Sequence, residues 1–362
     1  MSDQTSRVPQ TVTRTARTRG GSEEAYLEVT DLQVQFPTAD GMVKAVQGLS
    51  YSLPLGRTLA IVGESGSGKS VSSMAVMGLH DAKTARISGS IKVGGQQIVG
   101  MGEKDLEKFR GSGAAMIFQD PQSSLHPYFT IGDQIMEAYR AHHGVSKSKA
   151  RTRAIEMLDR VGIPNPKRRV GNYPHEFSGG MRQRAMIAMA LVNDPKLLIA
   201  DEPTTALDVT VQAQILDLIA DLQRDFGSAV VFITHDLGVV AEIADDILVM
   251  YAGSAIEHGP VEKILGTPLH PYTWGLLESI PALAGEPQPL HPIPGAPPSL
   301  LAVPTGCAFH PRCEFRSRVP GDRCTTLKPD LIPRTADTGR ASRCHLKDPD
   351  QIFQTEILPR LP

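Results

Sequence analysis

The sequence predicts an α/β fold with a mostly parallel sheet. Three short apolar segments, TLAIVG, KLLIA and AVVFI, have the composition of strands that are buried on both faces. Helical patterns separate them along the chain, and a glycine-rich loop follows the first segment directly. Strands that alternate with helices form parallel sheets with helices packed on their faces.

The N-terminal part of the chain does not share this pattern. Residues 1–25 are polar, contain four arginines and show no apolar periodicity, so we expect a disordered tail. A basic arm for anionic lipid or nucleic acid is the alternative, but four scattered charges favour the tail. From Tyr26 the segment YLEVTDLQVQF alternates polar and apolar residues, and GLSYSLPLG follows after a glycine-containing loop. These two segments predict β-strands.

Helical patterns dominate the middle of the chain. The segment KSVSSMAVMGL predicts a helix behind the glycine-rich loop, and residues 121–192 are expected to be mostly helical. One face of a further helix, between KLLIA and AVVFI, is marked by Val211, Ile215, Leu218, Ile219 and Leu222. The segment ILVMYAGSAIEHG predicts a closing hairpin that turns at Gly253 and Ser254. After about residue 266 the pattern changes, and eight prolines in residues 281–304 predict a semi-rigid linker.

Composition limits the function classes. The formal net charge of −2 over 362 residues gives no reason to expect a surface that coats nucleic acid. No apolar run has the length of a membrane span, and the N-terminus lacks the apolar core of a signal peptide. We therefore expect a cytoplasmic protein whose membrane role, if it has one, comes through a partner.

The loop GESGSGKS fits the phosphate-binding pattern G-x-x-x-x-G-K-[ST], with a strand before it and a helix after it. Its glycines allow backbone N–H groups to curl around a phosphate, and its lysine reaches the β- and γ-oxygens. The hydroxyl of its final serine can ligate Mg²⁺. The expected phosphate-binding residues are Gly63, Glu64, Ser65, Gly66, Ser67, Gly68, Lys69 and Ser70.

Polar residues follow the buried strands. Asp201 and Glu202 end KLLIADE, where we expect Asp201 to hold hydrated Mg²⁺ and Glu202 to polarise an attacking water. His235 follows AVVFIT and would contact the γ-phosphate or the water. Gln119, after AMIF, is an amide that could touch both Mg²⁺ and water. Taken alone, each of these residues is more often an ordinary strand-end residue. The phosphate loop in the same chain favours a functional role for them.

A second loop, FSGGMRQR, also has the features of an anion site but lacks a lysine. A hydroxyl and two glycines open a predicted helix, where free N–H groups and the helix dipole attract anions. One phosphate loop already precedes it by about a hundred residues, so the sequence poses the question of which phosphate the second loop would bind.

Taken together, GESGSGKS, the glutamine of FQD, FSGGMRQR, LLIADEP, TALD and the histidine of ITHD resemble the nucleotide-binding subunits of ABC transporters over residues 26–265. The resemblance implies a P-loop NTPase core with an antiparallel β subdomain and a helical subdomain, at about 121–192, that carries the second loop. It also implies two ATP molecules held between two head-to-tail subunits. Hydrolysis would then depend on closure of that dimer.

The same resemblance assigns residues to the dimer interface. Ser178, Gly179 and Gly180 would bind the γ-phosphate of ATP held by the partner's phosphate loop, and Asp208 would lie at the same interface. An aromatic ring would stack on adenine, for which Phe36 is the candidate and a core position the alternative.

More closely, the chain resembles the ATPase subunits of bacterial dipeptide and oligopeptide importers, to about residue 346. The resemblance rests on NYPHEFSGGMRQRAMIAMAL, FQDPQSSLHP and TPLHPYTWGLLESIP with the cysteine segment behind it. It implies two transmembrane permeases, a second and probably paralogous ATPase subunit, an extracytoplasmic peptide-binding protein, and a place on the cytoplasmic side of the membrane. Related systems import nickel or other small solutes, so the solute stays open. Departures from the family pattern are Phe177, Met181 and His126.

The chain has four cysteines, and all lie in the extension formed by residues 266–362, at Cys307, Cys313, Cys324 and Cys344. Disulfides are disfavoured in the cytoplasm, which leaves zinc or an iron–sulfur cluster, since both accept four thiolates. Nearby arginines would offset the charge of either site, namely Arg312, Arg316, Arg318, Arg323 and Arg343. The resemblance of GCAFHPRC to importer ATPases with a [4Fe–4S] cluster favours the cluster over zinc.

Two rival functions remain. A soluble ABC ATPase that acts on nucleic acid would be expected to carry coiled-coil insertions, tandem ATPase halves or a basic surface, and the sequence shows none of these. A small-molecule kinase would not need FSGGMRQR or TALD. We therefore expect an importer ATPase with no nucleic-acid partner.

Overall fold

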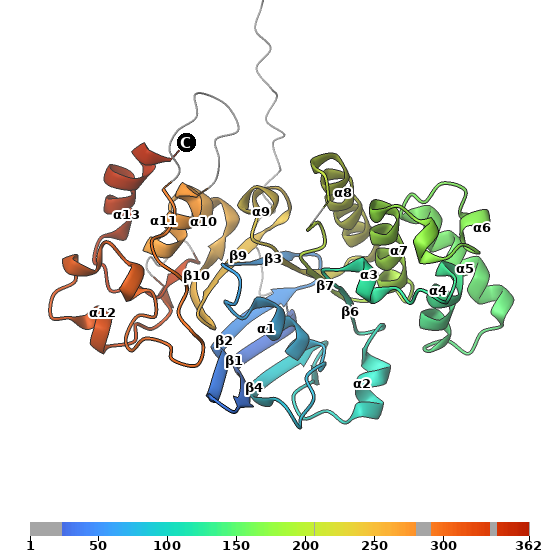
Figure 1. The fold of residues 1–362 in the computed structure, drawn as a ribbon, viewed down its shortest axis with the longest axis horizontal. Coiled ribbons are helices and arrows are strands. Elements are labelled where there is room, and N and C mark those ends of the chain that lie inside the picture. Colours follow the sequence, from blue (N-terminus) through green and yellow to red (C-terminus); the bar gives the residue numbers. More distant parts are fainter. Residues whose placement is uncertain (1–23, 206, 280–290, 334–338, 362) are drawn as a thin grey trace, which may run out of the picture.

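The structure is a computed structural model that describes residues 24–205, 207–279, 291–333 and 339–361. The predicted tail at 1–25 therefore lies almost wholly outside the described residues, as do residues 281–290 of the predicted linker. Two sheets form the centre of the molecule, with a group of helices at one end and the C-terminal extension at the other (Figure 1). The two sheets thus lie between two peripheral parts.

The first sheet is antiparallel, with the strand order β2-β1-β4-β5. Its strands are β1 (Ala25–Thr38), β2 (Gly41–Pro54), β4 (Arg86–Val93) and β5 (Gln96–Gln97). The predicted second strand, which began at Gly48, is too short, because Met42, Val43 and Lys44 also pair with β1. The segment before Gly48 therefore continues the strand, and only two residues connect β1 to β2.

The second sheet has the order β11-β12-β10-β9-β3-β8-β7-β6. Its parallel part is formed by β6 (Ala114–Ile117), β7 (Leu197–Asp201), β8 (Ala229–Ile233), β3 (Thr58–Val62) and β9 (Asp246–Tyr251). Every residue of β3, β6, β7 and β8 is buried, as expected for strands covered on both faces. The predicted α/β fold with a mostly parallel sheet and an antiparallel subdomain is confirmed.

Helices accompany this sheet. The phosphate loop is followed by α1 (Lys69–Val76), and the strand connections contain α2 (Glu103–Phe109), α8 (Val209–Phe226) and α9 (Leu237–Ile243). The predicted apolar face of α8 is buried at Ile215, Leu218, Ile219 and Leu222. The side chains of the sheet and of these helices together form the core that fixes the strand ends.

The helical arm lies beside α8 (Figure 1). It contains α3 (Pro121–Ser124), α4 (Ile131–Arg140), α5 (Lys147–Arg160), α6 (Pro166–Arg169), a 3-10 turn (Pro174–Glu176) and α7 (Gly179–Leu191). Side-chain hydroxyls of Thr130, Ser146 and Ser178 cap α4, α5 and α7. Within the described residues, none of the helices is long and apolar enough to cross a membrane.

The hairpin formed by β9 and β10 (Ser254–Pro260) turns one residue earlier than the sequence predicted. The turn residues are Ala252 and Gly253, with φ of 47° and 77°, and Ser254 already pairs with Tyr251. Glycine is needed at the second position because a Cβ there would lie 2.8 Å from the Ala45 carbonyl oxygen. The close approach to β2 therefore sets the position of the turn.

The C-terminal extension joins the main sheet. Strand β12 (Ala341–Ser342) pairs antiparallel with β10, and β11 (Ile332–Pro333) pairs with β12. Helix α10 (Val261–Gly266) leads into the extension, whose own helices are α11 (Pro271–Glu278), α12 (Arg323–Thr326) and α13 (Pro349–Ile352). Short turns that include 3-10 and π segments join them. On α11, Trp274 is buried with ring contacts to Phe315 at 5.0 Å and Phe353 at 6.3 Å. These rings belong to one apolar cluster with side chains of β3, β9 and α9, so the extension shares its core with the sheet.

A buried carboxylate on β10 anchors α11. Glu257 is fully buried and accepts hydrogen bonds from the backbone N–H of Leu269 at 2.5 Å and of His270 at 3.1 Å. The hydroxyl of Thr273 donates a third bond at 2.6 Å. Burial raises the pKa of Glu257 to about 7, although these three hydrogen bonds oppose the shift.

This pKa gives a stability prediction. The folded-state pKa of Glu257 lies above its unfolded value. Its contribution to the free energy of unfolding is therefore fully present below about pH 4.5 and is lost as the pH rises toward 7. The free energy of unfolding of the wild type, relative to Glu257→Gln, should therefore fall by on the order of 3 kcal/mol between pH 4.5 and 7.5. Chemical denaturation of both proteins across this range measures the difference, and parallel pH profiles would contradict it.

Candidate nucleotide site

The candidate site lies at the carboxyl edge of the parallel strands. In the register of the sheet, Ile233 of β8 lies opposite Ile61 of β3 on one side and opposite Asp201 of β7 on the other. The loops that leave these three strands therefore start at the same edge, which is where open α/β sheets bind ligands. The edge brings together the phosphate loop, Glu202 and His235.

The phosphate loop needs its glycines. Gly63, Gly66 and Gly68 have φ of 150°, 77° and 101°, in the region that side chains rarely adopt. A Cβ on Gly63 would lie 2.2 Å from the Met250 carbonyl oxygen, and one on Gly68 would lie 2.3 Å from that of Ala45. The loop is therefore pressed against β9 and β2, and α1 begins directly behind it with its N–H groups toward the loop.

Lys69 lies inside the loop. Its Nζ donates to the carbonyl oxygens of Gly63 at 2.7 Å and Glu64 at 3.0 Å, and the residue is buried. Burial lowers the pKa of Lys69, while the nearby carboxylates of Glu202 and Asp201 act in the opposite direction. The ammonium group is thus held between the loop and the two acidic residues.

Ser70 and Asp201 are in direct contact. The Ser70 hydroxyl donates to Asp201 Oδ1 at 3.1 Å, and Asp201 is 7% exposed. Burial raises the pKa of Asp201, and the hydrogen bond from Ser70 opposes this. A hydroxyl and a carboxylate side by side are oxygen ligands of the kind that Mg²⁺ takes, so the residues fit that ion.

Three side chains surround the carboxylate of Glu202. Gln119 Nε2 donates to it at 3.0 Å, the Thr205 hydroxyl donates at 2.9 Å, and His235 Nδ1 lies 3.5 Å from it. Its backbone has φ of 47°, which is uncommon for a residue with a side chain. Gln119, Glu202 and His235, predicted separately from the sequence, therefore lie together in the structure.

The second loop lies on the surface. Ser178 is the N-cap of α7, where its Oγ accepts from the Met181 backbone N–H at 3.3 Å, and both Ser178 and Gly179 are exposed. Phe177 is 2% exposed in the core of the arm, which explains how a large ring is accommodated there. Met181 contacts the serine hydroxyl through its backbone N–H, a group that almost any residue supplies.

Two further candidates have ordinary structural contacts. Asp208 is exposed and caps α8 by accepting from the Val211 backbone N–H at 3.0 Å. Phe36 packs against the core and makes an edge contact with the ring of His80 at 5.6 Å. Their predicted places at the dimer interface and against adenine stay predictions.

Sequence reasoning missed several residues at the site. Gln183 of α7 is buried and donates to the Pro203 carbonyl oxygen at 2.5 Å, which links the second loop's helix to the segment after Glu202. Thr205 was passed over inside the TALD segment. Tyr272 of α11 accepts a hydrogen bond from the Glu64 backbone N–H at 2.8 Å. Arg312 was assigned to charge balance near the cysteines, but it pairs with Glu64. A local sequence pattern does not predict such long-range contacts.

The four cysteines line one cavity between the turns of the extension and α11. Burial raises the pKa of Cys307 to about 11 and that of Cys313 to about 12, and the other three thiols act on Cys313 in the same direction. None of the four forms a disulfide. Among the described residues, no three His, Cys, Asp or Glu side chains are arranged to hold a single metal ion.

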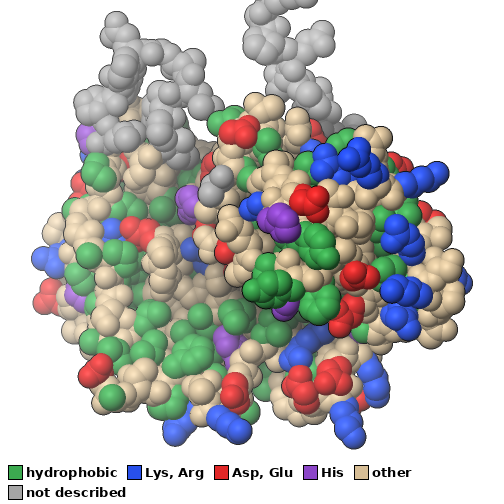
Figure 2. Space-filling model, turned by 45° about the vertical axis from the view of Figure 1, so that its right-hand side comes forward, with side chains coloured by type: hydrophobic (Ala, Val, Ile, Leu, Met, Phe, Trp, Pro, Cys, Tyr) green, Lys and Arg blue, Asp and Glu red, His purple; other side chains and the backbone are tan. Residues whose placement is uncertain are grey.

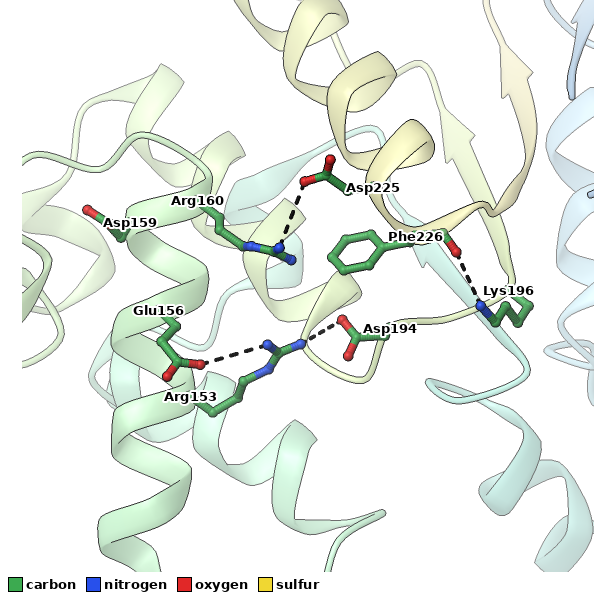
Figure 3. A pocket seen from close by; sticks show the side chains of 8 residues that line it. All are labelled: Arg153, Glu156, Asp159, Arg160, Asp194, Lys196, Asp225 and Phe226. Carbon is green, nitrogen blue, oxygen red and sulfur yellow. Dashed lines mark hydrogen bonds and ion pairs between the residues drawn. The ribbon is translucent and has the colours of Figure 1, made fainter. Parts of the chain in front are cut away.

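A separate open cleft of about 610 Å³ lies between the helical arm and the core (Figure 3). Arg153 of α5 pairs with Asp194 at 2.6 Å, and Arg160 lies 3.8 Å from Asp225 of α8. Lys196 donates to the Phe226 carbonyl oxygen at 3.2 Å. Arg153 and Arg160 of α5 thus pair with carboxylates across this cleft, and the contact of Arg160 with Asp225 links the arm to α8.

The chain matches two protein families and several solved structures. The family model described as "ABC transporter" matches residues 46–205, and the one described as "Oligopeptide/dipeptide transporter, C-terminal region" matches residues 256–319. The solved ABC transporter cassette MJ0796, described as dimeric, has a TM-score of 0.59 at 25% identity over 65% of this chain and 98% of its own. The cassette cbiO1 from Clostridium perfringens has a TM-score of 0.58 at 27% identity, over 67% of this chain and 92% of its own.

Curated relatives extend the likeness along nearly the whole chain. The oligopeptide transport ATP-binding protein OppD of Haemophilus influenzae is 54% identical over 88% of this chain and 97% of its own. OppD of Escherichia coli is 53% identical over 84% and 89%, and a putative peptide import ATP-binding protein of Brucella abortus is 49% identical over 88% and 94%. With this identity, the two family regions and the shared cassette fold, the chain belongs to the ATP-binding proteins of ABC transporters, in the oligopeptide and dipeptide transporter family.

Proposed function

We propose that this chain is the ATPase subunit of an importer for dipeptides or oligopeptides. The observation that carries the proposal is one chain with a phosphate loop facing Asp201 and Glu202 at a sheet edge, followed by the C-terminal region of peptide transporters. Its relatives are named as peptide transport or import ATP-binding proteins. The two rival functions, a nucleic-acid ATPase and a kinase, gain no support from these comparisons.

Binding of ATP would use groups that now bond within the chain. The β- and γ-phosphates take the place of the Gly63 and Glu64 carbonyl oxygens as partners of Lys69, and the loop N–H groups surround them. Ser70 and Asp201 would hold Mg²⁺, which neutralises phosphate charge. The close approaches at Gly63 and Gly68 hold the loop against β9 and β2 at these two positions.

Glu202 is the proposed general base. Its carboxylate accepts bonds from Gln119 and Thr205, which fix its orientation at the strand end. An attacking water placed between Glu202 and the γ-phosphate gives up a proton to the carboxylate, and His235, 3.5 Å from Glu202, orients the water or the phosphate. Gln119 lies in the loop between β6 and α3 of the helical arm, so a movement of the arm would reach the site through this residue.

The second loop is proposed to complete the ATP site of another subunit. Ser178 and Gly179 are exposed at the N-terminus of the thirteen-residue helix α7, so their N–H groups and the helix dipole face outward. On this proposal the loop binds the γ-phosphate of the ATP held by the partner's Lys69 loop. Gln183, bonded to Pro203, connects that contact with the hydrolytic segment of its own chain.

The permease partners are proposed to dock beside the Gln119 loop. Tyr128 is 82% exposed and Phe129 is 52% exposed, and the ring of His126 contacts both. Exposed aromatic groups are common at protein interfaces. On the face shown in Figure 2, hydrophobic side chains lie among acidic and basic side chains of both signs.

We place the chain on the cytoplasmic face of the membrane as a peripheral subunit, with two permeases, a second ATPase subunit and an extracytoplasmic peptide-binding protein. Nickel or another small solute is the alternative cargo.

We further propose that the four cysteines hold a [4Fe–4S] cluster with a structural role. Four thiols line one cavity, and four thiolates are a ligand set that both a cluster and zinc accept. The resemblance of GCAFHPRC to importer ATPases with a [4Fe–4S] cluster favours the cluster. A bound cluster would supply cross-links between the short turns of the extension. Zinc remains the alternative.

Replacing Glu202 by Gln should leave ATP binding intact and lower turnover by about 100-fold or more, because an amide keeps the shape but does not accept the proton. ATP hydrolysis in the assembled transporter and binding of a fluorescent ATP analogue measure the two effects. Lys69→Ala is the contrasting variant, since it should weaken binding itself. Near-normal hydrolysis by Glu202→Gln would exclude the residue as base.

Replacing Ser178 by Arg should abolish hydrolysis without weakening binding of ATP to the same chain's phosphate loop. The reason is that Ser178 serves the partner's ATP, whereas Lys69 serves its own. The isolated subunit should likewise hydrolyse ATP weakly and gain activity on assembly. If binding and hydrolysis are lost together, the two half-sites are not in different subunits.

Anaerobic purification should yield about four iron and four sulfide per chain, with absorption in the visible range. Replacing both Cys307 and Cys313 by Ser should remove the iron and the absorption. One zinc per chain without iron would overturn the cluster, and a folded extension free of any metal would overturn both forms of the site.

A further inference from the structure

The phosphate loop is tied to the C-terminal extension by a buried ion pair. Arg312, on the 3-10 turn His310–Arg312, donates to both carboxylate oxygens of Glu64, at 2.7 Å and 3.1 Å. The side chain of Arg312 is 6% exposed, and that of Glu64 is 26% exposed. A two-pronged contact of this kind fixes direction as well as distance, because both groups are planar.

Arg312 is itself held from several sides. Its Nε donates to the Pro294 carbonyl oxygen at 2.8 Å, and its second terminal nitrogen donates to that of Gly295 at 3.2 Å. The guanidinium also lies over the rings of Tyr251 and Phe309, at 5.9 Å and 6.0 Å from their centres. The guanidinium group of Arg312 is therefore fixed in place, and a shift of the loop would break its contact with Glu64.

The backbone of Glu64 is held from the same side. Its N–H donates to the hydroxyl of Tyr272, whose buried ring packs on Tyr251 at 4.7 Å and on Phe309 at 5.4 Å. Phe309 also lines the cavity of the four cysteines, and Cys313 directly follows Arg312. One packed group of side chains thus reaches from the cysteine cavity to the second residue of the loop.

We propose that Arg312 is a positioning residue for ATP binding, which holds Glu64 and hence the phosphate loop in the conformation that accepts the phosphates. This rests on the proposed role of the loop in binding ATP. The loop carries three glycines at left-handed φ, so it has little stiffness of its own, and an external anchor reduces the ordering required on binding. The extension then contributes to ATP affinity, while the chemistry at Glu202 does not depend on it.

The test is steady-state ATP hydrolysis by the assembled transporter carrying Arg312→Met, Arg312→Lys or Glu64→Gln. We expect the KM for ATP to rise about tenfold in Arg312→Met and Glu64→Gln, with kcat at saturating ATP within about twofold of the wild type. Arg312→Lys should recover part of the loss, because it keeps the charge but not the fork. The double variant Arg312→Met with Glu64→Gln should lose less than the product of the single losses.

Arg318→Met is the matched control. Arg318 lies in the same extension and makes a similar two-pronged contact with Glu356, at 2.6 Å and 2.7 Å, but does not reach the loop. Its loss should leave the KM unchanged. Should Arg312→Met fail to fold, Glu64→Gln carries the test, because Arg312 keeps its bonds to Pro294 and Gly295.

Two outcomes separate this proposal from the function it rests on. An unchanged KM in Glu64→Gln, with a raised KM in Lys69→Ala, would overturn the role of Arg312 and leave the ATP site in place. An unchanged KM in Lys69→Ala as well would overturn the phosphate loop itself. A fall in kcat equal to the rise in KM would show that Arg312 acts on the chemical step, which also contradicts the proposal.

Discussion

The pairing register of three parallel strands determines where the chemistry of this protein lies. Because Ile233 lies between Ile61 and Asp201 in the sheet, the three loops that follow leave from one edge. A shift of two residues in either pairing would move a loop by about 7 Å along the strand and separate Lys69 from Asp201 and Glu202. The fully buried side chains of these strands hold the register, since a slip would expose some of them and bury polar neighbours.

The C-terminal extension is part of the structure that carries the site. Its strand β12 covers the edge of β10, which would otherwise present open backbone groups. Its helix α11 is anchored through Glu257 and brings Tyr272 to the phosphate loop. The family boundary near residue 256 therefore falls inside strand β10, and the two family regions share one sheet.

Much of this arrangement follows from local sequence. Gly63, Lys69 and Asp201 could be predicted because phosphate loops and strand ends have strict residue requirements. The buried strands could be predicted from their apolar composition. The start of β2 and the turn at Ala252 were misplaced, since strand pairing and the approach of Ala45 decide them. The contacts of Gln183, Tyr272 and Arg312 could not be predicted from local sequence, because each joins residues that only the folded chain brings together. Motifs predict what a residue can do, whereas packing decides what it touches.

The pair between Glu64 and Arg312 joins residues 248 positions apart, which has a consequence for how the protein is made. At ordinary rates of translation, the ribosome needs roughly 10 to 50 s to add that length of chain. During that time the nascent ATPase core has its phosphate loop but neither the arginine that holds Glu64 nor the strand that covers β10. The nucleotide site therefore reaches its final form only after Arg312 has been added, so that a chain truncated before Arg312 carries the motif without the anchored loop.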